Sequence, residues 1–329
     1  MKNQYSYIGH EWQETSVIRA QLTEGRAKGV SAIFIENSSG LSLTVLEDRC
    51  LDIYTLRVKG KCIPYLSPCG IAAPAYFEPN GDEWLRNFSV GMLATCGFDQ
   101  VGDPCSFNGQ EYGLHGRASN LPAENVSVNT NDEEVVISAV IRQYKFQAQY
   151  LMLKRTINVK KFENKLSIHD EIINNGCKRQ PFMMLYHFNF GYPLINPETH
   201  IVLPPAEVKG WDEYSESVKD KMLVFNPPEN DYHEQTYNCR LKSQEKTASF
   251  SLANRKSDPE ITAQITYTTE NLPRLMYWKH LVSGEYVLAI EPCNNLARGV
   301  LDEDQNGTLQ YLEPGETKTN SFELAFDVK

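Results

Sequence analysis

A series of short β-branched or alternating runs, separated by turn residues, constrains the fold of this chain most. Val, Ile, Thr and aromatic residues at every second position are typical of strands. Asn-Gly, Pro-Gly and Asn-Ser-Ser-Gly sequences between such runs suit tight turns. Many short strands of this kind indicate a sandwich or a barrel, so we predict an all-β fold. The clearest runs are residues 31–36, 41–46, 125–128, 134–141, 150–159 and 165–173.

Two segments depart from this pattern. Long helix-period segments with caps are scarce, and residues 10–27 are the best helix candidate. Residues 204–238 are rich in Pro, Glu, Asp and Tyr, which predicts a long irregular excursion. Loops of that length in compact domains tend to be functional. No clean domain boundary is visible, and although 329 residues would suggest about two domains, all-β domains often run longer.

Charge and cysteine usage narrow the class of protein. The net charge of −10 disfavours nucleic acid or an anionic membrane as a partner, and it also serves solubility. The N-terminus leads into no signal-like apolar stretch, and no window approaches the ~20 apolar residues that span a bilayer. The eight cysteines show no metal or redox spacing. We therefore expect free thiols in a cytoplasmic protein, without a zinc site.

Two ionisable residues interrupt apolar, strand-like runs about a hundred residues apart. His187 lies in Leu-Tyr-His-Phe-Asn-Phe, and Glu291 ends Tyr-Val-Leu-Ala-Ile-Glu. Burial raises the pKa of a carboxyl group, and a nearby carboxylate raises that of a histidine, so both can be tuned for proton transfer. Each residue alone is more often structural. Together they form a candidate acid/base pair, and Asn189 is predicted to share the strand face of His187.

Further candidate residues fall in two places. Gly113-Leu-His-Gly-Arg117 sets His115 and Arg117 among glycines, which suits a loop that turns side chains toward a ligand, although a surface turn is an equal alternative. Trp278 could stack on a sugar ring or belong to the core. Its neighbour Lys279 is either a ligand contact or a solvated charge.

A third candidate lies in the acidic stretch Glu47-Asp-Arg-Cys-Leu-Asp52. Arg49 is either part of a structural ion-pair cluster or reaches a bound sugar.

These motifs, in this order, resemble the aldose 1-epimerase (galactose mutarotase-like) superfamily. The matching segments are Leu114-His-Gly, Tyr186-His-Phe-Asn, Ile290-Glu-Pro and Leu312-Glu-Pro-Gly-Glu. Asp48-Arg-Cys-Leu-Asp-Ile, Thr95-Cys-Gly and the extended run from Leu114 to Asn120 look like a less-characterised branch of formerly unknown function. The resemblance spans about residues 30 to 325.

The resemblance implies one large β-sandwich domain over residues 1–329, with residues 1–29 as an N-terminal extension packed on it. It implies Glu291 as general base and His187 as general acid. His115, Arg49, Arg117, Trp278, Lys279 and Asn189 are the expected substrate-binding residues. No metal or cofactor is expected. The partner would be a small-molecule sugar, with no nucleic acid and no membrane, and a homodimer is left open.

The chain also departs from the usual mutarotase pattern. Arg117 stands where a second glycine follows His-Gly, and an arginine in the cleft would favour an acidic or phosphorylated sugar. The family's additional aspartate has two candidates, Asp212 and Asp231. The leading hypothesis is an enzyme that interconverts the anomers of an unidentified sugar. The alternatives are a non-catalytic sugar-binding or regulatory protein, or an epimerase for sugar phosphates or acidic sugars.

Overall fold

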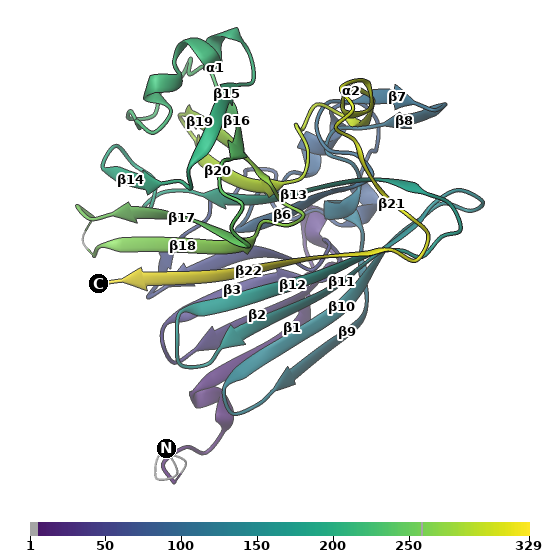
Figure 1. Ribbon diagram of the computed structural model, residues 1–329. Coiled ribbons are helices and arrows are strands. Elements are labelled where there is room, and N and C mark those ends of the chain that lie inside the picture. The colour runs from purple at the N-terminus through teal and green to yellow at the C-terminus, as the bar shows by residue number, and fades with distance from the viewer. Residues whose placement is uncertain (1–5, 258) are drawn as a thin grey trace.

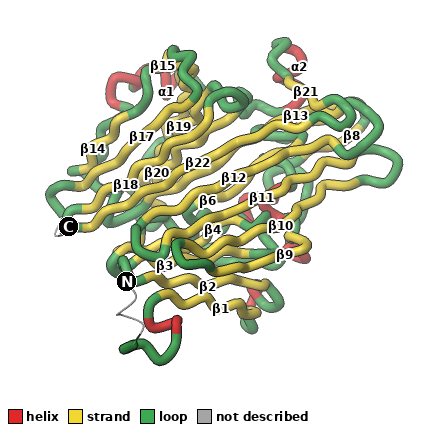
Figure 2. The backbone as a smooth tube through the Cα atoms, turned by 60° about the horizontal axis from the view of Figure 1, so that its bottom comes forward, coloured by secondary structure: helices red, strands yellow, loops and turns green. Residues whose placement is uncertain are grey.

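The computed structural model describes residues 6–257 and 259–329, which form four antiparallel sheets with few and short helices (Figures 1 and 2). The all-β prediction is confirmed. One sheet has the order β1 (Thr15–Gln21), β2 (Ser31–Asn37), β3 (Leu41–Leu46), β4 (Asp52–Val58), β5 (Lys61–Cys62). The largest sheet has the order β14 (Thr199–Val202), β17 (Thr247–Asn254), β18 (Ile261–Thr268), β22 (Thr317–Val328), β12 (Lys165–Asn174), β11 (Tyr150–Lys160), β10 (Glu134–Tyr144), β9 (Ala123–Thr130).

The third sheet carries the residues of greatest chemical interest. Its order is β15 (Ala206–Gly210), β16 (Gln235–Leu241), β19 (Arg274–Val282), β20 (Glu285–Cys293), β13 (Gln180–Phe190), β21 (Gln310–Leu312), and β6 (Leu93–Phe98) also pairs with β13. A small hairpin joins β7 (Cys105–Phe107) to β8 (Gln110–Tyr112). The helices are α1 (Glu213–Ser217) and α2 (Val300–Gln305), and the 3-10 turns are η1 (Glu11–Gln13), η2 (Gly25–Ala27), η3 (Pro74–Tyr76), η4 (Glu83–Asn87), η5 (Ala118–Asn120) and η6 (Lys219–Lys221).

The helix expected over residues 10–27 is wrong. Thr15–Gln21 form β1, which pairs with β2 along its whole length at the edge of the five-stranded sheet. Thr15, Val17 and Ile18 are β-branched, and the open edge of β2 offers them backbone partners. Part of the predicted N-terminal extension is therefore a strand of the sheet, while residues 1–5 lie outside the described residues.

The predicted irregular excursion over residues 204–238 is only partly irregular. It contains β15, which pairs with β16 over residues 206–210, and then α1 and η6. Figure 1 shows this segment projecting at the top of the molecule, above β14 and β17. Its return strand, β16, pairs with β19 and so brings the excursion back beside the central strands.

One hydrophobic core joins the three large sheets. It includes Ile33 and Val45 from the five-stranded sheet, Ile157 from the eight-stranded sheet, and Phe188 and Tyr277 from the seven-stranded sheet. Alternate residues of β10 and β11 point into it, as the period-two sequence pattern predicts.

A charged network lies inside this core. Arg155 is fully buried and donates two hydrogen bonds to the Asp170 carboxylate, at 2.9 and 2.7 Å, and one to Asp52 at 2.7 Å. Thr95 donates to Asp52, and the Tyr186 hydroxyl donates to Asp170. The network therefore links β4, β6, β11, β12 and β13 through charged and polar side chains that hydrogen-bond to one another.

The cysteines are all free, as predicted, and Cys50, Cys96, Cys239 and Cys293 are buried. Among residues 6–257 and 259–329, none of the helices has the length and apolar character needed to cross a membrane.

Candidate active site

His187 and Glu291 face each other across two neighbouring strands. The pairs Leu185–Cys293 and Phe188–Ile290 set the register between β13 and β20, which places His187 directly opposite Glu291. Residues directly opposite in an antiparallel pair carry their side chains on the same face of the sheet. His187 Nε2 lies 3.4 Å from Glu291 Oε1, so the two residues singled out from the sequence form one site.

Burial sets the charge state of this pair. Both side chains are 6% exposed. Burial raises the pKa of Glu291 to about 8. Burial, with a smaller contribution from neighbouring His115, lowers the pKa of His187 to about 3, while Asn189 acts in the opposite direction. The pair therefore holds one proton between its two members over a wide range around neutral pH.

A cleft of about 310 Å³ opens above this pair. Three of the chain's four tryptophans line it, namely Trp84, Trp211 and Trp278. The Trp278 ring lies edge-on to His187 with centroids 5.9 Å apart, and its Nε1 donates to Glu234 at 2.9 Å. Aromatic walls with a few convergent polar groups are typical of small-ligand sites, and tryptophan faces suit sugar rings.

His115 reaches the same cleft from the loop between β8 and η5. Its backbone has φ 55°, and Gly116 beside it has φ 72°. A Cβ at Gly116 would lie 2.6 Å from the Gln100 carbonyl oxygen, so this turn requires glycine. His115 Nδ1 accepts the Gly102 N–H at 3.3 Å, and burial lowers the pKa of His115 to about 4. The ring is therefore neutral at pH 7, with Nε2–H as a donor.

Arg49, by contrast, lies outside the cleft. Its guanidinium is buried and donates to the backbone carbonyl oxygens of Ser119, Ala72 and Asn87, at 2.6, 2.9 and 2.8 Å. The neighbouring acids do not surround it: Glu47 pairs with Arg19 across the edge of the sheet, and Asp52 joins the Arg155 network. The structure thus gives Arg49 a role in joining three loops and does not bring it to a sugar in the cleft.

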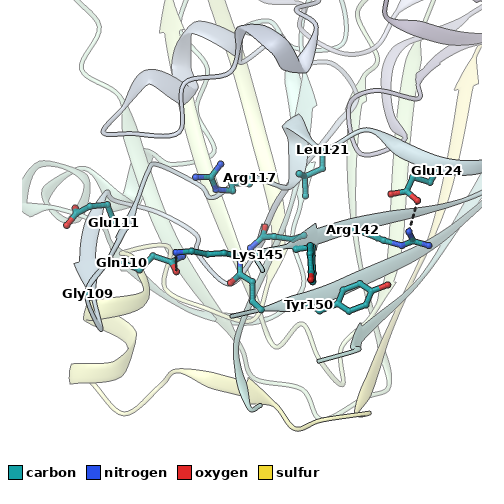
Figure 3. A pocket seen from close by; sticks show the side chains of 12 residues that line it. Gly109, Gln110, Glu111, Arg117, Leu121, Glu124, Arg142, Lys145 and Tyr150 are labelled. Carbon is teal, nitrogen blue, oxygen red and sulfur yellow. Dashed lines mark hydrogen bonds and ion pairs between the residues drawn. The ribbon is translucent and has the colours of Figure 1, made fainter. Parts of the chain in front are cut away.

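Arg117 does not line the cleft either. It lines a separate, open pocket of about 940 Å³ beside β10, with Arg142, Lys145 and Tyr150 (Figure 3). His115 lines the cleft while Arg117 lines this other pocket, and the left-handed backbone at His115 and Gly116 immediately precedes Arg117. The expectation that Arg117 enters the sugar cleft is therefore not met.

Neither Lys279 nor Asn189 lines the cleft. Lys279 follows Trp278 on β19, so its side chain points to the opposite face. There it is buried and donates to the carbonyl oxygens of Lys221, Met222 and Val224, and burial lowers its pKa to about 8. Asn189 is fully buried and donates to the carbonyl oxygens of Gly91 and His187. A direct contact of either residue with a ligand has no support from these positions.

Several residues of the cleft were missed from the sequence. They are Trp84, Trp211, Phe88, Asp103 and Glu234. The scarcity of tryptophan was a usable signal, because the argument made for Trp278 applies equally to Trp84 and Trp211. Asp212 and Asp231 do not line the cleft, and Asp212 instead caps α1 by accepting the Ser215 N–H at 2.7 Å. Asp103 and Glu234 are the acidic side chains that the fold brings there in addition to Glu291.

Solved structures with this fold include proteins from several bacteria. A Klebsiella pneumoniae protein, provisionally classed as an aldose 1-epimerase, superposes with a TM-score of 0.88 at 24% identity, over 95% of this chain and 83% of the other. A galactose mutarotase-like protein from Clostridium acetobutylicum superposes at 0.66 and 12%, over 96% and 100%. Galactose 1-epimerase from Lactobacillus acidophilus superposes at 0.62 and 15%, over 96% and 99%. At these identities the likeness shows the fold alone.

Sequence comparison defines the family. No curated protein matches the chain significantly. A family model described as "Domain of unknown function (DUF4432)" matches residues 27–326, which is most of the chain. With the galactose mutarotase-like fold, this match shows that the chain belongs to the DUF4432 family.

Proposed function

We propose that this protein is an aldose 1-epimerase-like enzyme that interconverts the anomers of a sugar by ring opening and closure. The observation that carries the proposal is the buried His187–Glu291 pair, 3.4 Å apart, at the floor of a cleft walled by tryptophans. Fold alone does not fix function, so the proposal rests on this chemistry.

The geometry of the pair suits the reaction. The pKa values of the two residues put the shared proton of the free pair on Glu291, and the reactive form is the one in which that proton has moved to His187 across the 3.4 Å contact. Glu291 then takes the proton of the anomeric hydroxyl while protonated His187 donates to the ring oxygen, and the bond between C1 and the ring oxygen breaks. Rotation about C1–C2 and closure on the other face then give the second anomer and return both protons. The two reacting oxygens share one carbon, so the acid and the base must be adjacent, as an opposite cross-strand pair is. His115 Nε2–H would hold a hydroxyl of the sugar in place.

Exchange NMR on a panel of aldoses tests the proposal. Magnetisation transfer between the two anomeric proton signals is expected to be faster with protein than in buffer, and saturable, for at least one sugar. Saturable binding without any acceleration would contradict it and would favour a sugar-binding or regulatory protein on the same fold.

The pH dependence of kcat/KM follows from the single shared proton. The reactive form of the pair carries one titratable proton, with Glu291 deprotonated and His187 protonated. That proton is lost as pH rises through the Glu291 pKa of about 8, and a second proton arrives near the His187 and His115 pKa values of about 3 and 4. We therefore expect a plateau between about 4 and 8 with a fall on each side, measured by exchange NMR across pH. A rate that keeps rising above pH 9 would show that His187 is not the acid.

The cellular compartment and the oligomeric state of the protein are proposals. Eight free thiols favour a reducing compartment, and we infer the cytoplasm. A homodimer stays a prediction.

A further inference from the structure

A second, strongly basic pocket lies next to the cleft and shares one wall with it. This pocket, of about 250 Å³, is lined by Lys209, Arg240, Arg274 and Arg298. Trp211 lines both this basic pocket and the cleft. The Arg298 guanidinium stacks on the Trp211 ring at 3.8 Å, so the shared wall itself carries a cation.

The strand register makes the floor of the cleft continuous with the floor of the basic pocket. Glu291 pairs with Met276 on β19, and Met276 lines the cleft. Arg274 lies two residues before Met276, on the same face, and pairs with Arg240 on β16. Two residues along a strand cover ~7 Å. Arg274 therefore lies one strand away from Glu291 and two residues along on the same face, a spacing on the scale of one sugar.

The cations of the basic pocket are not neutralised by ion pairs. In the part of the chain that the structure describes, none of the four has a carboxylate within 4.0 Å. Arg274 donates to the Asn238 side-chain oxygen at 2.7 Å, and Arg298 donates to the Trp211 carbonyl oxygen. Glu207 is the one acid in the lining, and it lies opposite Arg240 on the neighbouring strand. Three further carboxyl groups lie near enough for these cations to favour their ionised forms, namely Asp103 near Arg298, Glu303 near Arg274 and Glu216 near Lys209. In a chain of net charge −10, such a concentration of guanidinium groups without an ion-pair partner attracts an oxyanion.

We propose that the substrate is an aldose with an anionic group, a phosphate or a carboxylate, at the end remote from its anomeric carbon. Arg274 and Arg298 bind that group while His187 and Glu291 act on the anomeric centre. This inference rests on the proposed function. The inference assigns the recognition of the anionic group to the basic pocket and not to Arg117. The Arg117 pocket shares no lining residue with the cleft, and its Arg142 is already paired with Glu124 at 2.8 Å (Figure 3).

The test compares each neutral aldohexose with its 6-phosphate and its uronic acid, by kcat/KM from exchange NMR. One anionic form is expected to exceed its neutral parent at least tenfold, and which of the two does so identifies the group. The Arg274→Gln/Arg298→Gln double variant is expected to reduce that preference at least tenfold. Arg117→Gln, an exposed arginine of the other pocket, is the matched control and should keep the preference.

A second measurement keeps the inference testable if the double variant does not fold. Inorganic phosphate is titrated against the wild type and the exposed-rim variant Arg240→Gln by phosphorus NMR, with chloride at equal ionic strength as the reference. Saturable phosphate binding, weakened several-fold in Arg240→Gln but not in Arg117→Gln, supports the inference. Turnover of neutral sugars without anion preference or phosphate binding overturns it and leaves the proposed function standing. Phosphate binding without turnover of any sugar overturns the proposed function and retains the basic pocket as an anion site.

Discussion

Replacing Glu291 by glutamine is expected to lower kcat/KM for anomer interconversion by about 10²- to 10⁴-fold, the usual contribution of a general base. The amide has the shape of the carboxyl group but cannot accept the anomeric proton. The pKa of Glu291 is raised to about 8, so its side chain is largely neutral at pH 7 and glutamine should not disturb the packing. Stability is therefore expected to stay within about 1 kcal/mol of the wild type, since no buried charge is stranded.

Glu234→Gln provides the matched control for this variant. Glu234 lies in the same cleft, but its carboxylate accepts a hydrogen bond from Trp278 Nε1 and lies 3.8 Å from His280 Nδ1. Its replacement should change the rate far less than Glu291→Gln, with both rates measured by exchange NMR on the same sugar. Equal losses in the two variants, or a Glu291→Gln protein as fast as the wild type, would rule out the assigned base.

Replacing Arg155 by methionine is expected to lower the free energy of unfolding by about 3–5 kcal/mol. The guanidinium is fully buried and holds the carboxylates of Asp170 and Asp52, so its removal leaves two buried acids without their cation. Urea denaturation followed by tryptophan fluorescence measures the change.

A combined variant separates lost packing from stranded charge. Arg155→Met with Asp52→Asn and Asp170→Asn removes both acids together with the cation and should recover part of the lost stability, because neutral amides need no counter-ion. A single variant within 1 kcal/mol of the wild type would show that the network is not what stabilises this part of the core.

The sequence predicts where strands lie along the chain better than it predicts which strands pair. The run at residues 41–46 coincides with β3 because its alternation and its flanking turns are local properties. The pairing of His187 with Glu291 depends on a register between distant strands, which no local pattern specifies. The polar interruptions of two apolar runs suggested the pair, and the family resemblance implied the role of each residue. Period-two alternation could have excluded Lys279, since it adjoins Trp278 on one strand and must face the other way.

Arg49 and Arg117, which do not line the cleft, show why side-chain direction in loops is harder to predict than strand position. Arg49 precedes Cys50 and Arg117 follows Gly116, and both of these neighbours have a positive φ. Composition does not show which side of such a turn a residue takes. The basic pocket was missed for a similar reason, because its cations come from β15, β16, β19 and the loop after β20, and only the strand register assembles them.

The position of the acid/base pair on β13 and β20 also bears on how the protein would lose activity. These strands are in the middle of their sheet, and their neighbours belong to the main core. Local opening reaches chain ends and loops at little cost, but central strands open only with the whole structure. His187 and Glu291 are thus assembled by folding itself, before any ligand arrives. Inactivation of the pair by heat or denaturant should therefore coincide with the cooperative collapse of the sandwich rather than precede it.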